Sequence, residues 1–171
     1  RAGTPIAETQ AVLNESGQCL AFEPPDYGSV ATIGGTIASG LSGPSRPYRG
    51  SVRDFVLGVT CVNGRGESLR FGGQVMKNVA GYDVSRLMVG AMGTLGAILD
   101  VSFKVLPVPE SEQTRVYEVS EEMAIEKMNE WAAQPWPLSA ACFLKNKLRI
   151  RLSGTEAGVD AAVRDLGGTQ D

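Results

Sequence analysis

The chain has 171 residues, of which 43% are apolar and 20% charged, and a net charge of −3 at pH 7. This composition is typical of globular proteins and argues against a disordered, membrane-spanning or nucleic-acid-binding chain. The sequence contains no histidine, which excludes Ser-His-Asp and Cys-His catalysis and every His-ligated metal site.

The three cysteines are widely separated and form no paired metal or redox motif. The sequence has no apolar run of roughly 18 residues and no signal peptide, so we expect a cytoplasmic protein without a membrane span. The chain starts with Arg1-Ala2-Gly3-Thr4, without a methionine, and continues directly into a helix signal. We therefore expect that it begins inside a longer protein.

The first part of the chain predicts a helix, a glycine-rich loop and a hairpin. Thr4-Pro5 is a typical helix start and Gly17 a typical end, which predicts a helix over 5–16. The stretch 27–50 is dense in Gly, Ser, Thr and Pro, and we expect a ligand-facing loop that carries a short helix. Runs at 55–62 and 67–71 flank Asn63-Gly64 and predict two antiparallel strands.

A short capped helix and a strand complete this part. Asp83 is a typical N-cap for a helix that extends to Met88, and the alternation over 98–106 predicts a half-buried strand. Pro107 and Pro109 end that strand. We therefore place a domain boundary here, with one domain over 1–109 and another over 110–171.

The second part predicts the order βαββα. Strands are expected over 115–119, 140–144 and 148–152, the last two around a turn at Asn146. A helix capped by Ser120 and a helix over 159–166 that ends at Gly167 complete the order. In the first of these helices an apolar stripe is expected to face the core, and its members are Ala124, Met128, Trp131 and Ala132.

Glycine is enriched, with 21 residues, and most of them lie in the part of the chain that ends at Gly96. Glycine allows positive φ and a close approach of the backbone to a ligand, although many tight turns would also explain the enrichment. The adjacent Gly34-Gly35 follow an apolar strand end, and free N–H groups there would form a nest for an anionic oxygen, assisted by the hydroxyls of Thr36 and Ser39. A plain turn is an equal alternative at this position.

Two further segments have a similar character. The segment 90–98 reads Gly-Ala-Met-Gly-Thr-Leu-Gly-Ala-Ile and leads into a strand. The segment 77–83 reads Lys-Asn-Val-Ala-Gly-Tyr-Asp and offers a cation, an amide and a phenol beside a glycine. These groups suit a phosphate or a polar ring edge, and a capped loop is the alternative.

Together these three segments, in this order and with Pro24 before them, resemble the vanillyl-alcohol oxidase family, also called the PCMH-type FAD-binding family. The resemblance covers about 1–110, and the runs at 46–50, 52–58 and 71–83 look like the E-type FAD-binding subunits of bacterial glycolate oxidases. It implies an α+β fold in which 1–109 is the second subdomain of the FAD-binding domain, a sheet flanked by helices, and 110–171 is part of a ferredoxin-like cap. The first FAD-binding subdomain is then expected before Arg1.

In this family FAD lies between two subdomains and is held largely by backbone groups and small residues. The resemblance places the main-chain amides near 34–40 and 93–98 on one surface against FAD and leaves the catalytic residues unassigned. The implied FAD-binding residues are Pro24, Gly34, Gly35, Thr36, Ala38, Ser39, Gly40, Arg53, Lys77, Tyr82, Gly93, Thr94, Gly96 and Ile98.

The implied function is oxidation of a 2-hydroxy acid by an FAD-dependent oxidoreductase subunit, with electrons passed to a second flavin subunit and an iron–sulfur subunit. Contact with the inner membrane would come through these partners. Because the chain lacks histidine and the first subdomain, we expect it to be inactive alone. Met92 stands where relatives often have a carboxylate, which favours the alternative of a flavin-free docking subunit; a flavin oxidoreductase for another substrate is a third reading.

Overall fold

The computed structural model describes residues 1–28, 30–73 and 82–171, and the chain forms two compact units. Unit 1 is Arg1–Val108 and unit 2 is Pro109–Asp171. The boundary lies at the expected proline pair, one residue before the expected position. The assignment of these units to an FAD-binding subdomain and a cap remains a prediction.

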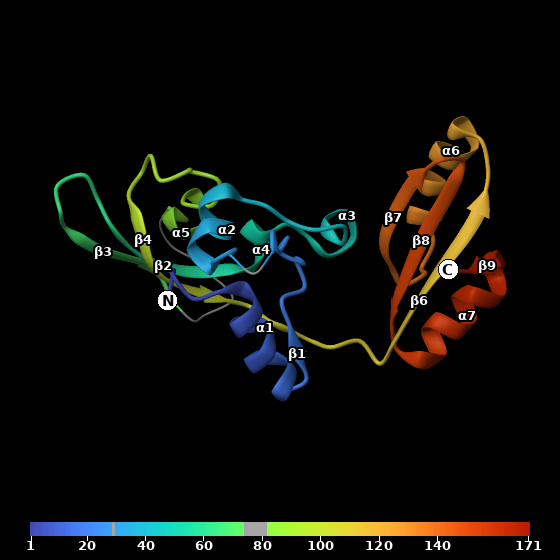
Figure 1. The fold of residues 1–171 in the computed structure, drawn as a ribbon, viewed down its shortest axis with the longest axis horizontal. Coiled ribbons are helices and arrows are strands. Elements are labelled where there is room, and N and C mark those ends of the chain that lie inside the picture. Colours follow the sequence, from blue (N-terminus) through green and yellow to red (C-terminus); the bar gives the residue numbers. More distant parts are fainter. Residues whose placement is uncertain (29, 74–81) are drawn as a thin grey trace. The chain divides into compact units, whose positions relative to one another are not determined.

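Unit 1 is built around a three-stranded antiparallel sheet with the order β3-β2-β4 (Figure 1). A separate two-stranded sheet pairs β1 with β5. The helices are α1 Ile6–Glu15, α2 Ile33–Ser39, α3 Arg46–Arg49, α4 Val52–Phe55 and α5 Val84–Leu87, and the strands are β1 Gln18–Cys19, β2 Val56–Val62, β3 Ser68–Gly72, β4 Ala97–Phe103 and β5 Leu106–Pro107.

The predicted hairpin is present as β2 and β3, but its connection is longer than a two-residue Asn-Gly turn. The Asn63 side-chain oxygen accepts hydrogen bonds from the N–H groups of Arg65 and Glu67. Gly66 has a φ of +77°, which a glycine adopts at low cost. Asn63-Gly64 therefore predicted the turn at the right place, and the hydrogen bonds of the Asn63 side chain determine the conformation of the longer loop.

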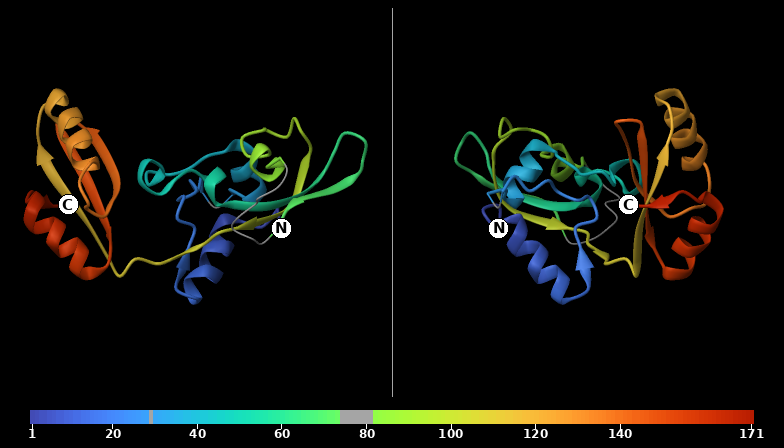
Figure 2. Two further views of the ribbon diagram at one scale, coloured as in Figure 1. Left: turned by 180° about the vertical axis from the view of Figure 1, so that it is seen from behind. Right: turned by 45° about the vertical axis from the view of Figure 1, so that its right-hand side comes forward.

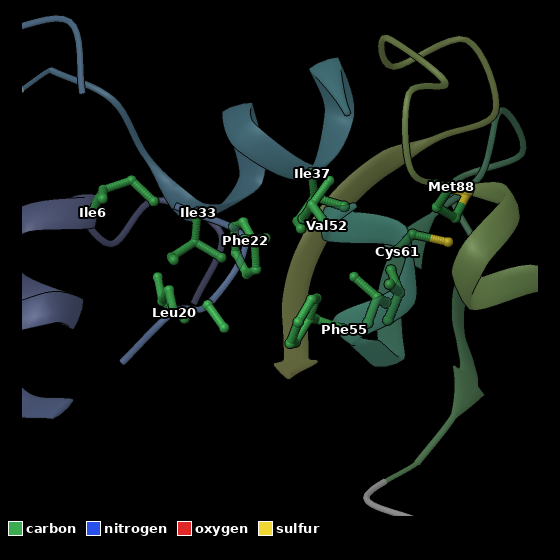
Figure 3. Close-up of a cluster of buried hydrophobic side chains, with 12 residues drawn as sticks. Ile6, Leu20, Phe22, Ile33, Ile37, Val52, Phe55, Cys61 and Met88 are labelled. Carbon is green, nitrogen blue, oxygen red and sulfur yellow. The ribbon is translucent and has the colours of Figure 1, made fainter. Parts of the chain in front are cut away.

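The core of unit 1 lies between the sheet and its helices (Figure 3). Phe22 is fully buried, and its ring centroid lies 5.7 Å from that of Phe55 and 5.9 Å from that of Phe103. Ile37 of α2 is also fully buried in this cluster. The apolar side of α2 thus fixes the helix on the sheet and leaves its other side outward.

Unit 2 contains a four-stranded antiparallel sheet with the order β7-β8-β6-β9. Helices α6 and α7 share one core cluster with the strands, so they cover the same face of the sheet (Figure 2). The elements are β6 Ser111–Glu118, α6 Glu121–Ala132, β7 Leu138–Leu144, β8 Lys147–Gly154, α7 Glu156–Leu166 and β9 Thr169–Gln170.

Two details of unit 2 differ from the expectation. The expected order βαββα was incomplete, because β9 adds a fourth strand beside β6. Arg115 fixes this short strand by donating hydrogen bonds to the carbonyls of Gly167 and Gly168. In α6, Ser120 caps Met123 as predicted and Trp131 is buried, but Ala132 is exposed and does not belong to the core stripe.

Truncation of Phe22 should destabilise unit 1. Phe22→Ala removes a buried ring that contacts two other rings, and we expect a loss of about 3–5 kcal/mol in the free energy of unfolding. Urea unfolding followed by far-UV circular dichroism measures this loss. Val12→Ala, at a side chain 60% exposed, is the control and should change stability by less than about 0.5 kcal/mol. Equal effects of the two substitutions would contradict this account of the core.

Candidate functional site

The glycine-rich segment folds as α2, a short helix with defined ends. Thr32 is the N-cap, and its hydroxyl oxygen accepts a hydrogen bond from the Gly35 N–H at 3.2 Å. Gly40 ends the helix in the left-handed region with a φ of +69°. Both ends follow the usual preference for a hydroxyl cap and a terminal glycine.

The expectation of free N–H groups at the start of α2 is wrong. All four of the first N–H groups donate to acceptors within unit 1, so these groups form no open nest for an anion. The pairs are Ile33 to the Thr4 carbonyl at 3.0 Å, Gly34 to the Ala2 carbonyl at 2.7 Å, Gly35 to the Thr32 hydroxyl, and Thr36 to the Thr32 carbonyl at 2.9 Å.

The two hydroxyls that were expected to assist a nest are also engaged within the protein. Thr36 is only 6% exposed and lies on the core side of α2. The Ser39 hydroxyl lies 2.8 Å from the Gly35 carbonyl and 3.2 Å from the Thr36 carbonyl, to which it donates. The outward side of α2 consequently presents the small residues Gly35, Ala38 and Ser39, which follow each other at helical spacing.

The two glycine segments lie side by side, as the expected convergence requires (Figure 1). The Gly90 N–H donates to the Ile37 carbonyl and the Met92 N–H to the Ala38 carbonyl, both at 2.9 Å. Near the other end of α2, the Ala2 N–H donates to the Leu99 carbonyl while the Ala2 carbonyl accepts from Gly34. Main-chain bonds therefore connect α2 to the segment 90–99 at both ends.

Three glycines of the candidate site are required by packing within unit 1. A Cβ at Gly34 would lie 2.7 Å from the Ala2 Cβ, and a Cβ at Gly96 would lie 2.6 Å from the Val62 carbonyl oxygen. A Cβ at Gly40 would lie 3.2 Å from the Gly90 Cα. These three residues must be glycine because neighbouring segments of the chain pack closely against them, and this requirement does not depend on a bound ligand.

Gly35 and Gly93 differ from these three because nothing in the described part of the fold crowds them. A Cβ at Gly35 would meet only its own N-cap hydroxyl, at 3.2 Å, and a Cβ at Gly93 would meet no described atom within 4 Å. Both residues are exposed. Among the described residues, the N–H groups of Gly93 and Leu95 find no acceptor. The open backbone of the site is therefore at Gly35 and 93–95.

The remaining predicted site residues have different environments. Pro24 is buried, and Ile98 packs partly buried against the core. Thr94 donates from its hydroxyl to the Ala91 carbonyl at 2.6 Å. Arg53 is exposed on α4, and Tyr82 is 96% exposed before α5. Lys77 lies outside the described residues. Contact of any of these with a cofactor remains a prediction.

Charged side chains around α4 and α5 form a group that the sequence did not indicate. Asp54 accepts hydrogen bonds from the Ser51 N–H at 2.8 Å and the Ser51 hydroxyl at 2.9 Å, which lower the pKa of the Asp54 carboxyl. Burial opposes ionisation of Asp83, but its hydrogen bonds and nearby arginines outweigh burial and lower its pKa. The Ser-x-x-Asp pattern at 51–54 is typical of a capping box, and it was the feature of the sequence that could have predicted the hydrogen bonds of Asp54.

The open face of the sheet in unit 1 carries a pocket of about 180 Å³ that the sequence did not indicate. In the register of the sheet, Thr60 of β2 lies between Arg70 of β3 and Asp100 of β4.

Within the described residues, no group of His, Cys, Asp or Glu side chains could hold a metal ion, and no helix is long and apolar enough to cross a membrane.

Comparison with known proteins identifies the fold and its relatives. Residues 1–72 match the family model described as FAD binding domain. The chain is 52% identical over 170 residues to the glycolate oxidase subunit GlcE of Escherichia coli, an alignment that covers 99% of this chain and 49% of GlcE. The chain thus spans about half the length of this relative.

Other relatives share the first part of the chain. Identity is 42% over 95 residues to the glycolate oxidase subunit GlcD of Bacillus subtilis, covering 54% of this chain and 20% of GlcD. Identity is 40% over 89 residues to D-lactate dehydrogenase of Anaerostipes hadrus, covering 52% and 19%. A solved structure of alkyldihydroxyacetonephosphate synthase has a TM-score of 0.74 at 18% identity, covering 94% of this chain and 36% of that one, and shows a similar fold.

The residues present fit a dinucleotide held by backbone groups. The outward side of α2 has no long side chain at Gly35, Ala38 or Ser39, and the adjacent 93–95 backbone offers two N–H groups that have no acceptor among the described residues. Such N–H groups can satisfy phosphate or ring acceptors. The start of α2 does not contribute this way, because its N–H groups are already bonded.

Substitution of Gly34 and of Gly35 should affect stability differently, because only Gly34 is required by packing within unit 1. Gly34→Ala brings a Cβ into Ala2, and we expect a loss of about 1–3 kcal/mol in stability. Gly35→Ala should change stability by less than about 1 kcal/mol, because the lower entropy of the unfolded chain offsets a tight contact with Thr32. Thermal unfolding of both variants measures the difference, and an equal loss would refute the assignment of Gly34 to packing.

Acid should destabilise unit 1 partly through Asp54 and Asp83. A carboxyl with a lowered pKa in the folded state stabilises the fold above its unfolded pKa of about 3.9, and this contribution disappears as the pH falls through the folded pKa. We expect unfolding free energy measured between about pH 6 and pH 2 to fall less steeply in Asp54→Asn than in the parent. Glu8→Gln, at an exposed carboxylate of α1, is the control. An unchanged slope for Asp54→Asn would contradict the prediction.

Proposed function

We propose that the chain serves in the FAD-binding subunit of a glycolate oxidase, from the premise that residues 1–72 match the family model described as FAD binding domain. The support for this specific role is the 52% identity to GlcE over nearly the whole chain. The relatives named glycolate oxidase and D-lactate dehydrogenase favour a small 2-hydroxy acid as substrate.

The observation that carries the proposal is the pairing of the two glycine segments. The hydrogen bonds from Gly90 to Ile37 and from Met92 to Ala38 hold the 93–95 backbone beside the outward side of α2. We propose that this surface holds part of FAD, with Gly35 allowing close approach and the N–H groups of Gly93 and Leu95 donating to it. Arg53, Lys77 and Tyr82 would contribute from the neighbouring segments.

Bound FAD supplies the acceptor for the hydride that leaves the hydroxyl-bearing carbon of a 2-hydroxy acid. The hydroxyl proton needs a base, and this chain contains no histidine to act as one. We therefore assign the base to residues outside this chain, on the same subunit or on a companion. The role of this chain is then to bind FAD and to support electron transfer.

The proposed partners are a second flavin subunit and an iron–sulfur subunit that receives the electrons. The likeness to both GlcE and GlcD, each described as a glycolate oxidase subunit, supports a multisubunit assembly. Contact with the inner membrane would come through the partners, and the protein itself would lie on the cytoplasmic side.

Gly35→Leu tests the proposed site. A leucine side chain would occupy the outward surface of α2, and we expect flavin content to fall about tenfold or more, as for a loss of roughly 1.4 kcal/mol or more in binding. Flavin absorption of the protein purified at its natural length, together with glycolate-dependent dye reduction, measures the effect.

The matched control is Gly64→Leu in the β2–β3 loop. A Cβ at Gly64 meets no described atom within 4 Å, and the φ of Gly64, like that of Gly35, is not positive, but Gly64 lies outside the proposed site. This variant should keep its flavin. Normal flavin content in Gly35→Leu would contradict the proposal that FAD binds at this surface.

A second candidate function is a docking subunit of the same fold that binds no flavin. The occupied N–H groups at the start of α2 favour it, because they remove an anion site that the fold would otherwise offer. Absence of flavin absorption from the natural-length protein, alone and with its companions, would support this reading. Colour that appears only after co-expression with companions would indicate a site shared between subunits. The third alternative is a flavin oxidoreductase for another substrate. Flavin content without glycolate-dependent dye reduction would favour it, and D-lactate, the substrate named for one relative, is a first substrate to test beside glycolate.

A further inference from the structure

The pocket on the open face of the unit 1 sheet contains polar and charged side chains, several of which have no partner among the described residues. We call it the sheet pocket; its volume is about 180 Å³, and its lining includes Gly58, Thr60, Arg70, Gly73, Asp100 and Ser102. We propose that the sheet pocket binds a small hydroxy monocarboxylate. This site goes beyond the proposed function, because its ligand class follows from its own residues.

Glycines form the hollow of the sheet pocket. Gly58 lies in β2 and places no side chain on the floor of the pocket. A Cβ at Gly58 would lie 2.8 Å from the Gly73 carbonyl oxygen. Gly72, with a φ of +66°, turns the chain at the end of β3, and the Gly73 N–H then donates to the Leu57 carbonyl at 3.1 Å. The backbone at Gly73 therefore closes one end of the pocket and leaves its middle free of side chains.

Opposite charges lie on the two sides of the sheet pocket. Thr60 lies between Arg70 and Asp100 in the register of the sheet, so the backbones of these two residues are about 10 Å apart, or two strand spacings. Asp100 contacts Arg1 at 3.2 Å. Arg70 forms no hydrogen bond or ion pair with any described residue. The space between Arg70 and Asp100 thus suits a small molecule with an acceptor at one end and a donor at the other.

The charge balance of the sheet pocket favours a monoanion. Arg1, Arg70 and Asp100 together carry one positive charge in excess. A carboxylate would balance this charge and accept charge-assisted hydrogen bonds from the Arg70 guanidinium. A phosphate dianion would be repelled by Asp100, and an amino acid would bring no net negative charge.

The donor of the ligand is then a neutral hydroxyl. A hydroxyl can donate to the Asp100 carboxylate without changing the charge of the ligand. The hydroxyls of Thr60 and Ser102 form no hydrogen bond with any described residue, so they offer further donors and acceptors at the floor of the pocket. These groups together fit a molecule of a few heavy atoms that carries one carboxylate and one hydroxyl.

The sheet pocket is separate from the surface proposed to hold FAD. Successive side chains of a strand point to opposite faces, and Val59 and Cys61 of β2 share the core cluster with Ile37 of α2. Thr60, between them, faces the other side. The pocket and α2 therefore lie on opposite faces of the sheet. Glycolate belongs to the inferred ligand class, so the sheet pocket would be a second site for the proposed substrate.

Arg70→Gln tests the inferred site. The dissociation constant of the natural-length subunit for glycolate, measured by isothermal titration calorimetry at constant ionic strength, should rise about tenfold or more, as for a lost hydrogen bond to a charged group. Melting temperature and flavin content should stay unchanged, because Arg70 is exposed and lies outside the proposed FAD surface. Arg65→Gln, at an exposed arginine of the β2–β3 loop, is the matched control and should keep the parent affinity.

Acetate and glycine test the inferred ligand class in the same assay. Acetate lacks the hydroxyl and should bind to the parent about fivefold or more weakly than glycolate. Glycine, which is zwitterionic, should also bind more weakly than glycolate. In Asp100→Ala the acceptor for the hydroxyl is removed, so the affinities for glycolate and acetate should differ by less than about twofold.

Absence of glycolate binding to the parent, or equal binding by the parent and Arg70→Gln, would overturn the inference. Equal affinity of the parent for glycolate and acetate would also overturn it. Glycolate binding that persists in Arg70→Gln but is lost in Gly35→Leu would place the ligand at the proposed FAD surface instead. If the subunit and its companions contain no flavin, the proposed function fails, but loss of glycolate binding in Arg70→Gln alone would still support the sheet pocket.

Discussion

The close approach of two main-chain segments is the constraint on which the candidate site depends. α2 and the segment 90–99 are joined by hydrogen bonds from Gly90 to Ile37 and from Met92 to Ala38, and Gly40 lies so near Gly90 that a Cβ would be crowded. A larger residue at Gly40 would also have to adopt a positive φ. The backbone that faces outward here is positioned by this contact, because the buried Ile37 and Ile33 anchor the helix on the core.

This arrangement divides the glycines by their physical roles. Gly34, Gly40 and Gly96 permit backbone contacts inside unit 1, whereas Gly35 and Gly93 are open toward the outside. The same sequence feature, a glycine in a conspicuous motif, therefore has two causes. A reading that assigns every motif glycine to a cofactor overestimates the site, because several of these glycines are required by packing alone.

Much of the fold followed from local patterns. Asp83, Ser120 and Gly167 mark helix ends through their own side chains or conformation, and the sequence predicted all three at the right residues. Ala132 was misassigned because helical spacing places a residue on a face but does not determine where the neighbouring strands end. Strand β9 was missed because a strand of two residues is too short to show an alternation of apolar and polar side chains. The position of β9 also depends on Arg115, which lies in β6, far away in the sequence.

The sequence by itself determined the family resemblance, the hairpins, the capped helices and the two glycine segments, because each depends on residues close together in the chain. It also excluded histidine chemistry outright. Only the tertiary structure decided which N–H groups remain available: Thr4 and Ala2 occupy those at the start of α2, while those of Gly93 and Leu95 stay without acceptors among the described residues. The reason is that hydrogen-bond partners are set by segments that meet through folding, and no local pattern records that meeting.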